Sequence, residues 1–115
     1  MRYLMLINTV EAEDAKATAE EGAASFAEYA SLMEELGAQG KVLAGERLRP
    51  TSTATTIRVL DGEILTTDGP FAETKEQIGG YFIVDCKDID EAIEVAARIP
   101  AARAGSVEVR PIWEE

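Results

Sequence analysis

The sequence predicts an α+β domain in which two helices cover one face of an antiparallel sheet. Three observations support this fold class. The chain has 115 residues, the usual size of one domain, and no internal repeat or long linker divides it. Short apolar segments typical of strands alternate with two segments of helical spacing. Asp61-Gly62 lies between two strand-like runs, and this dipeptide is typical of a β-hairpin turn.

The N-terminal third predicts a strand followed by a helix. Residues 2–7 form a run that is apolar at successive positions and is expected to be a strand. Thr18 and Glu21 have the spacing of a capping box, so the helix is expected to begin near Thr18. Gly37 and Gly40 are expected to end it. Its predicted apolar stripe consists of Phe26, Tyr29, Ala30, Met33 and Leu36.

The middle of the chain predicts a strand, then a hairpin, then an irregular segment. Gly45 within the expected second strand indicates a bulge or a close approach of another group. The Asp61-Gly62 turn requires positive φ at both central positions and joins two antiparallel strands. The expected strands of this region are residues 42–49, 54–60 and 64–67.

The C-terminal third repeats the strand–helix–strand order. Residues 81–84 predict a strand, Asp88 and Glu91 cap a second helix, and residues 107–112 predict the last strand. The stripe of this helix is Ile89, Ala92, Ile93, Ala96 and Ile99, with Pro100 after it. With the hairpin treated as an insertion, the order is the split βαβ, ferredoxin-like pattern, in which both helices lie on one face of the sheet.

The second face of this sheet also needs a cover. Residues 3–7 and 81–84 are apolar at consecutive positions, so they present apolar side chains to both faces. Each buried side chain of this kind contributes about 1.5–3 kcal/mol. A second copy that presents the same surface is the expected cover, which makes the protein a sheet-to-sheet homodimer. The alternative is that the inserted hairpin folds back over this face.

Composition excludes several classes of function. Twenty-two Asp and Glu residues outnumber eleven Lys and Arg, which gives a net charge of −11 and argues against nucleic-acid or anionic-membrane partners. The chain has no His and one Cys, so His-dependent catalysis, His- or Cys-rich zinc sites and intramolecular disulfides are excluded. No metal or cofactor is predicted. The sequence shows no signal-peptide pattern, and a cytoplasmic location is expected.

The segment after the hairpin is the candidate site. Its Asp-Gly-Pro-Phe turn fixes the backbone and holds Phe71 in a defined place. In the functional interpretation Asp68 accepts or carries a proton, while Phe71 and Tyr81 form the apolar wall of a pocket. Lys75 and Arg47 would bind a negatively charged group of the ligand.

A structural interpretation of the same residues stays open. Asp68 would then bond to turn amides, Phe71 would fill the core, and the charged residues that follow would be solvated. Cys86 is expected to pack rather than react, and Trp113 is expected to be an interface anchor. The acidic residues expected on a solvated surface are Glu11, Glu13, Asp14, Glu20 and Glu21.

Three segments resemble the DGPF-domain branch of the YCII-related family: residues 54–59, 67–81 and 107–112. The resemblance covers nearly the whole chain, so residues 1–115 are expected to form one such domain. It implies a dimeric α+β barrel in which two ferredoxin-like subunits pack sheet to sheet. This implication agrees with the independent argument from the strand pattern.

The resemblance leaves more than one function open. Some YCII relatives are enzymes with a His–Asp pair, for example in the dehydrochlorination of aromatic intermediates, and Asp68 is the only part of that pair this chain offers. The first hypothesis is a small-molecule-binding homodimer of lyase or isomerase type. The second is a non-catalytic interaction module, since relatives are often encoded beside alternative sigma factors. The third is a structural dimer whose turn only locks the fold.

Overall fold

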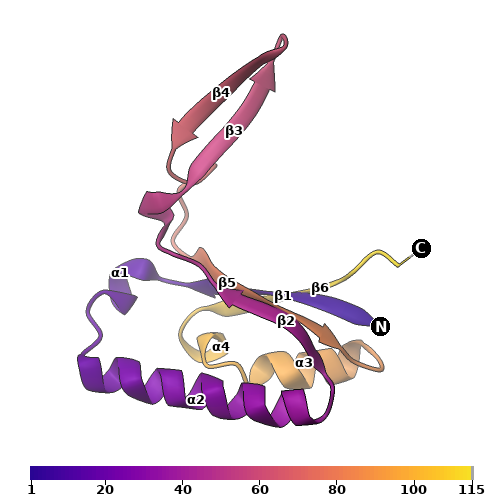
Figure 1. The fold of residues 1–115 in the computed structure, drawn as a ribbon. Coiled ribbons are helices and arrows are strands. Elements are labelled where there is room, and N and C mark those ends of the chain that lie inside the picture. The colour runs from indigo at the N-terminus through magenta and orange to yellow at the C-terminus, as the bar shows by residue number, and fades with distance from the viewer. Residues whose placement is uncertain (115) are drawn as a thin grey trace.

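The body of the protein is a four-stranded antiparallel sheet with helices on one face, as the computed structural model of residues 1–114 shows (Figure 1). The strands are β1 (Arg2–Thr9), β2 (Val42–Arg47), β5 (Gln77–Asp85) and β6 (Ser106–Pro111). Their order across the sheet is β2-β5-β1-β6, with β1 and β5 in the centre. This order is that of a split βαβ arrangement, and the predicted α+β class is confirmed.

The helices are α1 (Glu11–Asp14), α2 (Ala19–Ala38), α3 (Ile89–Ala97) and α4 (Ala101–Ala104). The two longer ones, α2 and α3, begin at the capping residues that the sequence predicts, whereas the short helices α1 and α4 were not predicted. The Thr18 hydroxyl accepts a hydrogen bond from the Glu21 amide at 3.1 Å, and the Asp88 carboxylate accepts one from the Glu91 amide at 2.9 Å. Gly40, with φ of 69°, ends α2 in the left-handed conformation. None of these helices is long and apolar enough to span a membrane.

The core lies between the sheet and the helices, and the central strand β1 supplies three of its largest side chains. Tyr3, Met5 and Ile7 alternate along β1 and are all buried against the helices. Leu4 and Leu6 lie between them and therefore point to the opposite face. The helices contribute buried Leu32, Leu36, Ala92, Val95, Ala96 and Ala101, and Ile99 follows α3.

Both helices bury a stripe that differs from the predicted one. The exposed members of the predicted stripes are Phe26, Ala30, Ile89 and Ile93. In α2 the buried stripe includes Leu32. Phe26 is exposed and lies in the N-terminal half of the helix, which extends beyond the sheet (Figure 1). In α3 the buried face is centred on Val95 and includes Ala92 and Ala96. These residues recur at helical intervals just as the predicted stripe does, so spacing alone could not distinguish the two faces.

The inserted hairpin stands apart from the body. It consists of β3 (Thr55–Leu60) and β4 (Glu63–Asp68), which pair only with each other. Asp61 and Gly62 have φ of 52° and 80°, which confirms the predicted turn. The hairpin projects from the side of the sheet opposite the helices (Figure 1) and does not fold back over the second face, so that alternative is wrong. Within residues 1–114 this face has no covering layer.

Two glycines allow close approaches that hold the sheet together. A Cβ at Gly45 would overlap the ring of Phe82, which confirms the close approach predicted for β2, and the register of β2 shifts between Val42 and Ala44. A Cβ at Gly105 would overlap the carbonyl oxygen of Asn8 on β1. The chain can therefore pass from α4 into β6 beside β1 only with glycine at this position.

We expect Gly105→Ala to lower the free energy of unfolding by about 1–3 kcal/mol, because the added methyl group must displace backbone of β1. Urea denaturation followed by circular dichroism measures the change. Gly22→Ala is the control: its Cβ meets open space within α2, and it should raise stability by about 0.5–1 kcal/mol. Equal stability of Gly105→Ala and the wild type would contradict the close approach.

Candidate functional site

An open groove of about 530 Å³ lies where the hairpin joins the body. Its walls come from α1, from the 3₁₀ turn η1 (Thr51–Thr53), from the end of β4 and from the segment that leads into β5. The polar side chains that line it are those of Glu11, Thr51, Ser52, Asp68, Glu73, Thr74 and Gln77. The groove is therefore rich in carboxylates and hydroxyls, and its described lining includes no Lys or Arg.

Glu11 organises the floor of this groove. Its carboxylate accepts hydrogen bonds from the Thr51 amide at 2.8 Å and from the Thr51 hydroxyl at 2.7 Å. The Glu11 amide in turn donates to the Gln77 side-chain oxygen at 3.0 Å. These bonds connect α1, the entry to the hairpin and the start of β5. The prediction that Glu11 belongs to a solvated acidic surface is wrong.

Asp68 lies at the end of β4 and borders the groove. The backbone of Gly69 closes the turn that follows. The Gly69 amide donates a hydrogen bond to the Ala54 carbonyl at 2.7 Å, and the Gly69 carbonyl accepts one from the Thr56 hydroxyl at 2.9 Å. Gly69 has φ of 98°, a conformation that glycine adopts without strain. Among residues 1–114 the Asp68 carboxylate has no hydrogen-bond partner, so it is open to a ligand in the groove.

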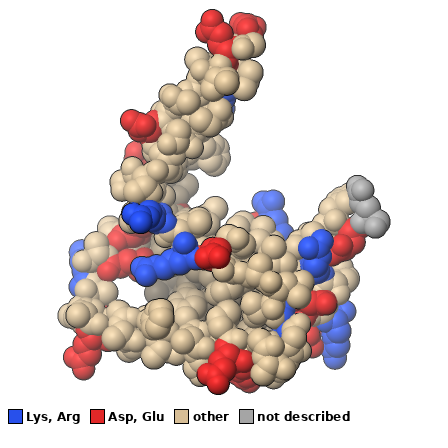
Figure 2. All heavy atoms as spheres, in the orientation of Figure 1, with Lys and Arg blue, Asp and Glu red and all other residues tan. Residues whose placement is uncertain are grey.

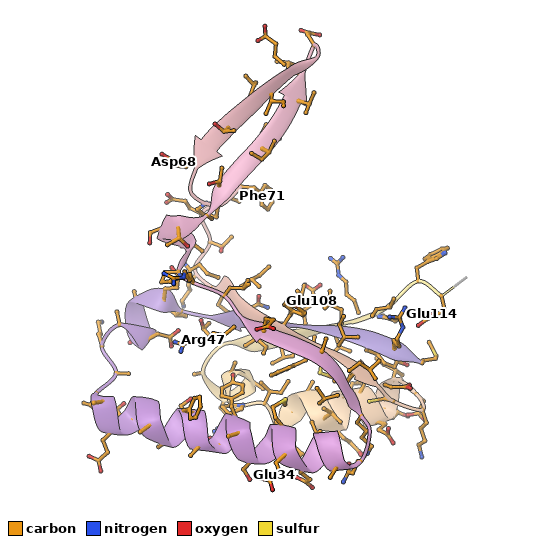
Figure 3. The ribbon with its side chains drawn as sticks, viewed as in Figure 1. Glu34, Arg47, Asp68, Phe71, Glu108 and Glu114 are labelled. Atoms are coloured by element: carbon orange, nitrogen blue, oxygen red, sulfur yellow. The ribbon has the colours of Figure 1, made fainter. Side chains whose placement is uncertain are left out.

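The other predicted site residues lie outside this groove. Phe71 is 80% exposed and extends on the opposite side of the hairpin base from Asp68 (Figure 3). It neither fills the core nor lines the groove. Lys75 and Arg47 are exposed, and Tyr81 lies on the uncovered face of the sheet, opposite Leu6 of β1. The structure of one chain thus does not bring the five predicted residues together.

The sequence did not reveal the residues that line the groove together with Asp68. Glu11 and Thr51 are 40 positions apart, and no local pattern connects them. The one available signal was the polar Thr51-Ser52-Thr53 run directly after Pro50, which is typical of a turn at the entry to a hairpin. Only the return of the chain past α1 brings this run against the acidic segment.

A second hollow of about 400 Å³ lies between α2, the end of α3 and α4. Its charged groups are used in ion pairs, Arg103 with Glu28 at 2.7 Å and Arg98 with Glu35. The Arg98 guanidinium holds the pKa of the Glu35 carboxyl below its ordinary value. These partly exposed pairs connect the helices and leave no free charge to bind a ligand among the described lining residues, so the groove beside Asp68 is the better candidate site.

Metal binding and thiol catalysis are not supported by the residues that the structure describes. In the part of the chain that the structure describes, no three carboxylate or thiol side chains converge as metal ligands. Cys86 is buried, and burial raises the pKa of its thiol, which disfavours the reactive thiolate. The structure thus agrees with the packing role predicted for Cys86.

Comparison with known families places the chain. The YCII-related domain matches residues 1–115. The chain belongs to the YCII-related family. An uncharacterised protein of Rhizobium meliloti (strain 1021) is 36% identical to this YCII-related chain over 114 residues, which cover 97% of the chain and 92% of the relative.

A solved structure shares the fold of this YCII-related protein. It is a 5-chloro-2-hydroxyhydroquinone dehydrochlorinase from Burkholderia phenoliruptrix AC1100, in complex with 2,5-dihydroxybenzoquinone. The two structures superpose with a TM-score of 0.53 over 99% of this chain and 94% of the enzyme chain, at 16% sequence identity. At this level of identity the likeness shows a common fold.

We expect Glu11→Ala to loosen the base of the hairpin, because the Thr51 amide and hydroxyl lose a charged acceptor. The free energy of unfolding should fall by about 1–3 kcal/mol, and the Thr51 amide should exchange faster with deuterium. Glu13→Ala removes an exposed carboxylate of the same helix and should change neither quantity appreciably. Unchanged exchange at Thr51 in Glu11→Ala would show that the bridge does not hold the hairpin.

Proposed function

We propose that this YCII-related protein binds a small hydroxylated organic molecule in the groove beside Asp68. The observation that carries the proposal is the free Asp68 carboxylate, which faces a groove lined by the Thr51 and Ser52 side chains. Such a lining accepts hydrogen bonds and suits a neutral ligand that donates them. The dehydrochlorinase of the same fold, which acts on a hydroxylated aromatic ring, supports this ligand class.

The proposed chemistry is proton transfer by Asp68. A carboxylate within hydrogen-bond reach of a ligand hydroxyl or of an acidic C–H can act as a general base, which is the role required in a lyase or isomerase. The Asp68-Gly69-Pro70-Phe71 turn that presents this carboxylate also supports placing the chain in the DGPF branch of the family. Lys75 and Arg47 lie outside the groove in one chain and remain predicted contacts for an anionic group of the ligand.

Asp68→Asn tests this site with hydroquinone as the probe. Titration under argon should shift the amide resonances of Thr51, Ser52 and Gly69 in a ¹H–¹⁵N NMR spectrum of the wild type. Asp68→Asn should weaken this binding roughly tenfold or more, since a charged acceptor is lost. Asp61→Asn, the same change at the hairpin tip, is the control and should bind as the wild type does. An equal response of Asp68→Asn would favour the non-catalytic interaction module.

We also propose that the uncovered face of the sheet pairs with the same face of a second copy. The register places Leu4 opposite Ile83 and Leu6 opposite Tyr81, which makes an apolar centre on β1 and β5. The edge strands add charged residues on the same face, Glu46 from β2 and the Glu108–Arg110 pair from β6. An apolar centre with a polar rim is typical of a protein interface.

Leu6→Lys tests this pairing by sedimentation equilibrium. The substitution would place an ammonium group in the apolar centre, so the dissociation constant of the dimer should rise at least about tenfold. Ala24→Lys carries the same charge on the exposed surface of α2 and should sediment as the wild type does. A wild type that stays monomeric at a concentration on the order of 100 µM would contradict the homodimer.

A further inference from the structure

The hairpin has one aliphatic face. Residues that pair directly across an antiparallel ribbon share a face, and here Ile57 pairs with Thr66 and Val59 with Ile64. We call this set, Ile57, Val59, Ile64 and Thr66, the aliphatic face. The next pair along it toward the body is Thr55 with Asp68, so the aliphatic face runs directly into the candidate site. The opposite face carries Arg58 and Glu63 beside Leu60 and Leu65.

The aliphatic face is uncovered in the single chain. Ile57, Val59 and Ile64 are 55%, 68% and 72% exposed. The hairpin stands clear of the body and carries few charges between its acidic tip and its base (Figure 2). The radius of gyration is 16.1 Å, whereas a compact chain of this length has one of roughly 13 Å. An isolated two-stranded ribbon is marginally stable in water, so this hairpin needs a cover.

We propose that the aliphatic face of the hairpin docks on a second copy of this chain and there closes the groove over Asp68. The inference rests on the sheet pairing proposed above and adds a second contact to it. The hairpin rises from the same side of the sheet as the uncovered face (Figure 1), so a copy seated on that face also meets the hairpin. Under two-fold symmetry each copy covers the hairpin of the other, and one continuous interface buries both apolar surfaces.

The charge distribution on the aliphatic face permits a second copy as the occupant. Each chain carries a net charge of −11, so two copies associate only where carboxylates do not oppose each other. The aliphatic face meets this requirement, because Asp68 at its base is the only charged residue among the pairs on that side of the ribbon. An anionic membrane, the other common partner of an apolar surface, is disfavoured by the same net charge.

The contact has a consequence for the candidate site. Asp68 lies in the last pair of the ribbon, between the aliphatic face and the Thr51 and Ser52 wall of the groove. In this proposal, a copy that covers the aliphatic face also reaches Asp68 at the edge of the groove and supplies a wall there. Binding of a small molecule and docking of the hairpin are then coupled, because each excludes water from the same carboxylate.

Val59→Thr/Ile64→Thr tests the contact, with Leu60→Thr/Leu65→Thr as the matched control on the opposite face. Threonine keeps the strand propensity in both variants and removes apolar surface from one face only. In sedimentation equilibrium the dissociation constant should rise about tenfold or more for the first variant and change less than about threefold for the control. In the wild type, deuterium exchange of residues 55–68 should slow as protein concentration increases.

The possible outcomes separate this inference from the proposals above. A dimer that Leu6→Lys disrupts but Val59→Thr/Ile64→Thr does not would overturn hairpin docking and leave the sheet pairing in place. A monomeric wild type would overturn both, whereas a hydroquinone response of that monomer that Asp68→Asn weakens would still support the ligand site. Circular dichroism checks that the double variant folds, and the single change Ile57→Thr replaces it if it does not.

Discussion

The central strand β1 is apolar on both of its faces, and the rest of the structure depends on this constraint. Tyr3, Met5 and Ile7 reach the helices and form the core, while Leu4 and Leu6 point to the other side of the sheet. Two helices can cover only the first set. One strand of this YCII-related chain therefore contributes side chains both to the buried core and to a sheet face that the helices leave uncovered.

The inserted hairpin uses this arrangement to build the candidate site. It leaves the sheet at the edge strand β2 and returns into the central strand β5, so its base lies beside both. The Glu11 bridge to Thr51 fixes the entry, and the backbone of Gly69 fixes the exit. Asp68 is held between these two attachments with its carboxylate free, which is the arrangement that a hydrogen-bonding or proton-accepting group requires.

In the proposals made above, assembly and chemistry would meet at the base of the hairpin. One chain leaves two apolar surfaces open: the sheet face, which includes Tyr81, and the aliphatic face of the hairpin, which ends at Asp68. A chain without His relies mainly on carboxylates as side-chain proton acceptors, and these work best where water is excluded. A groove that is open in one chain and closed by a second would supply that condition.

The sequence by itself determined the elements whose signals lie in neighbouring residues. The Thr18 and Asp88 caps and the Asp61-Gly62 turn depend on contacts within a few positions. Only the tertiary structure decided which way each helix faces, as Phe26 on the outside shows, and that Glu11 meets Thr51. It also separated Phe71 from Asp68. These features depend on how distant segments pack, and adjacent residues carry no information about that.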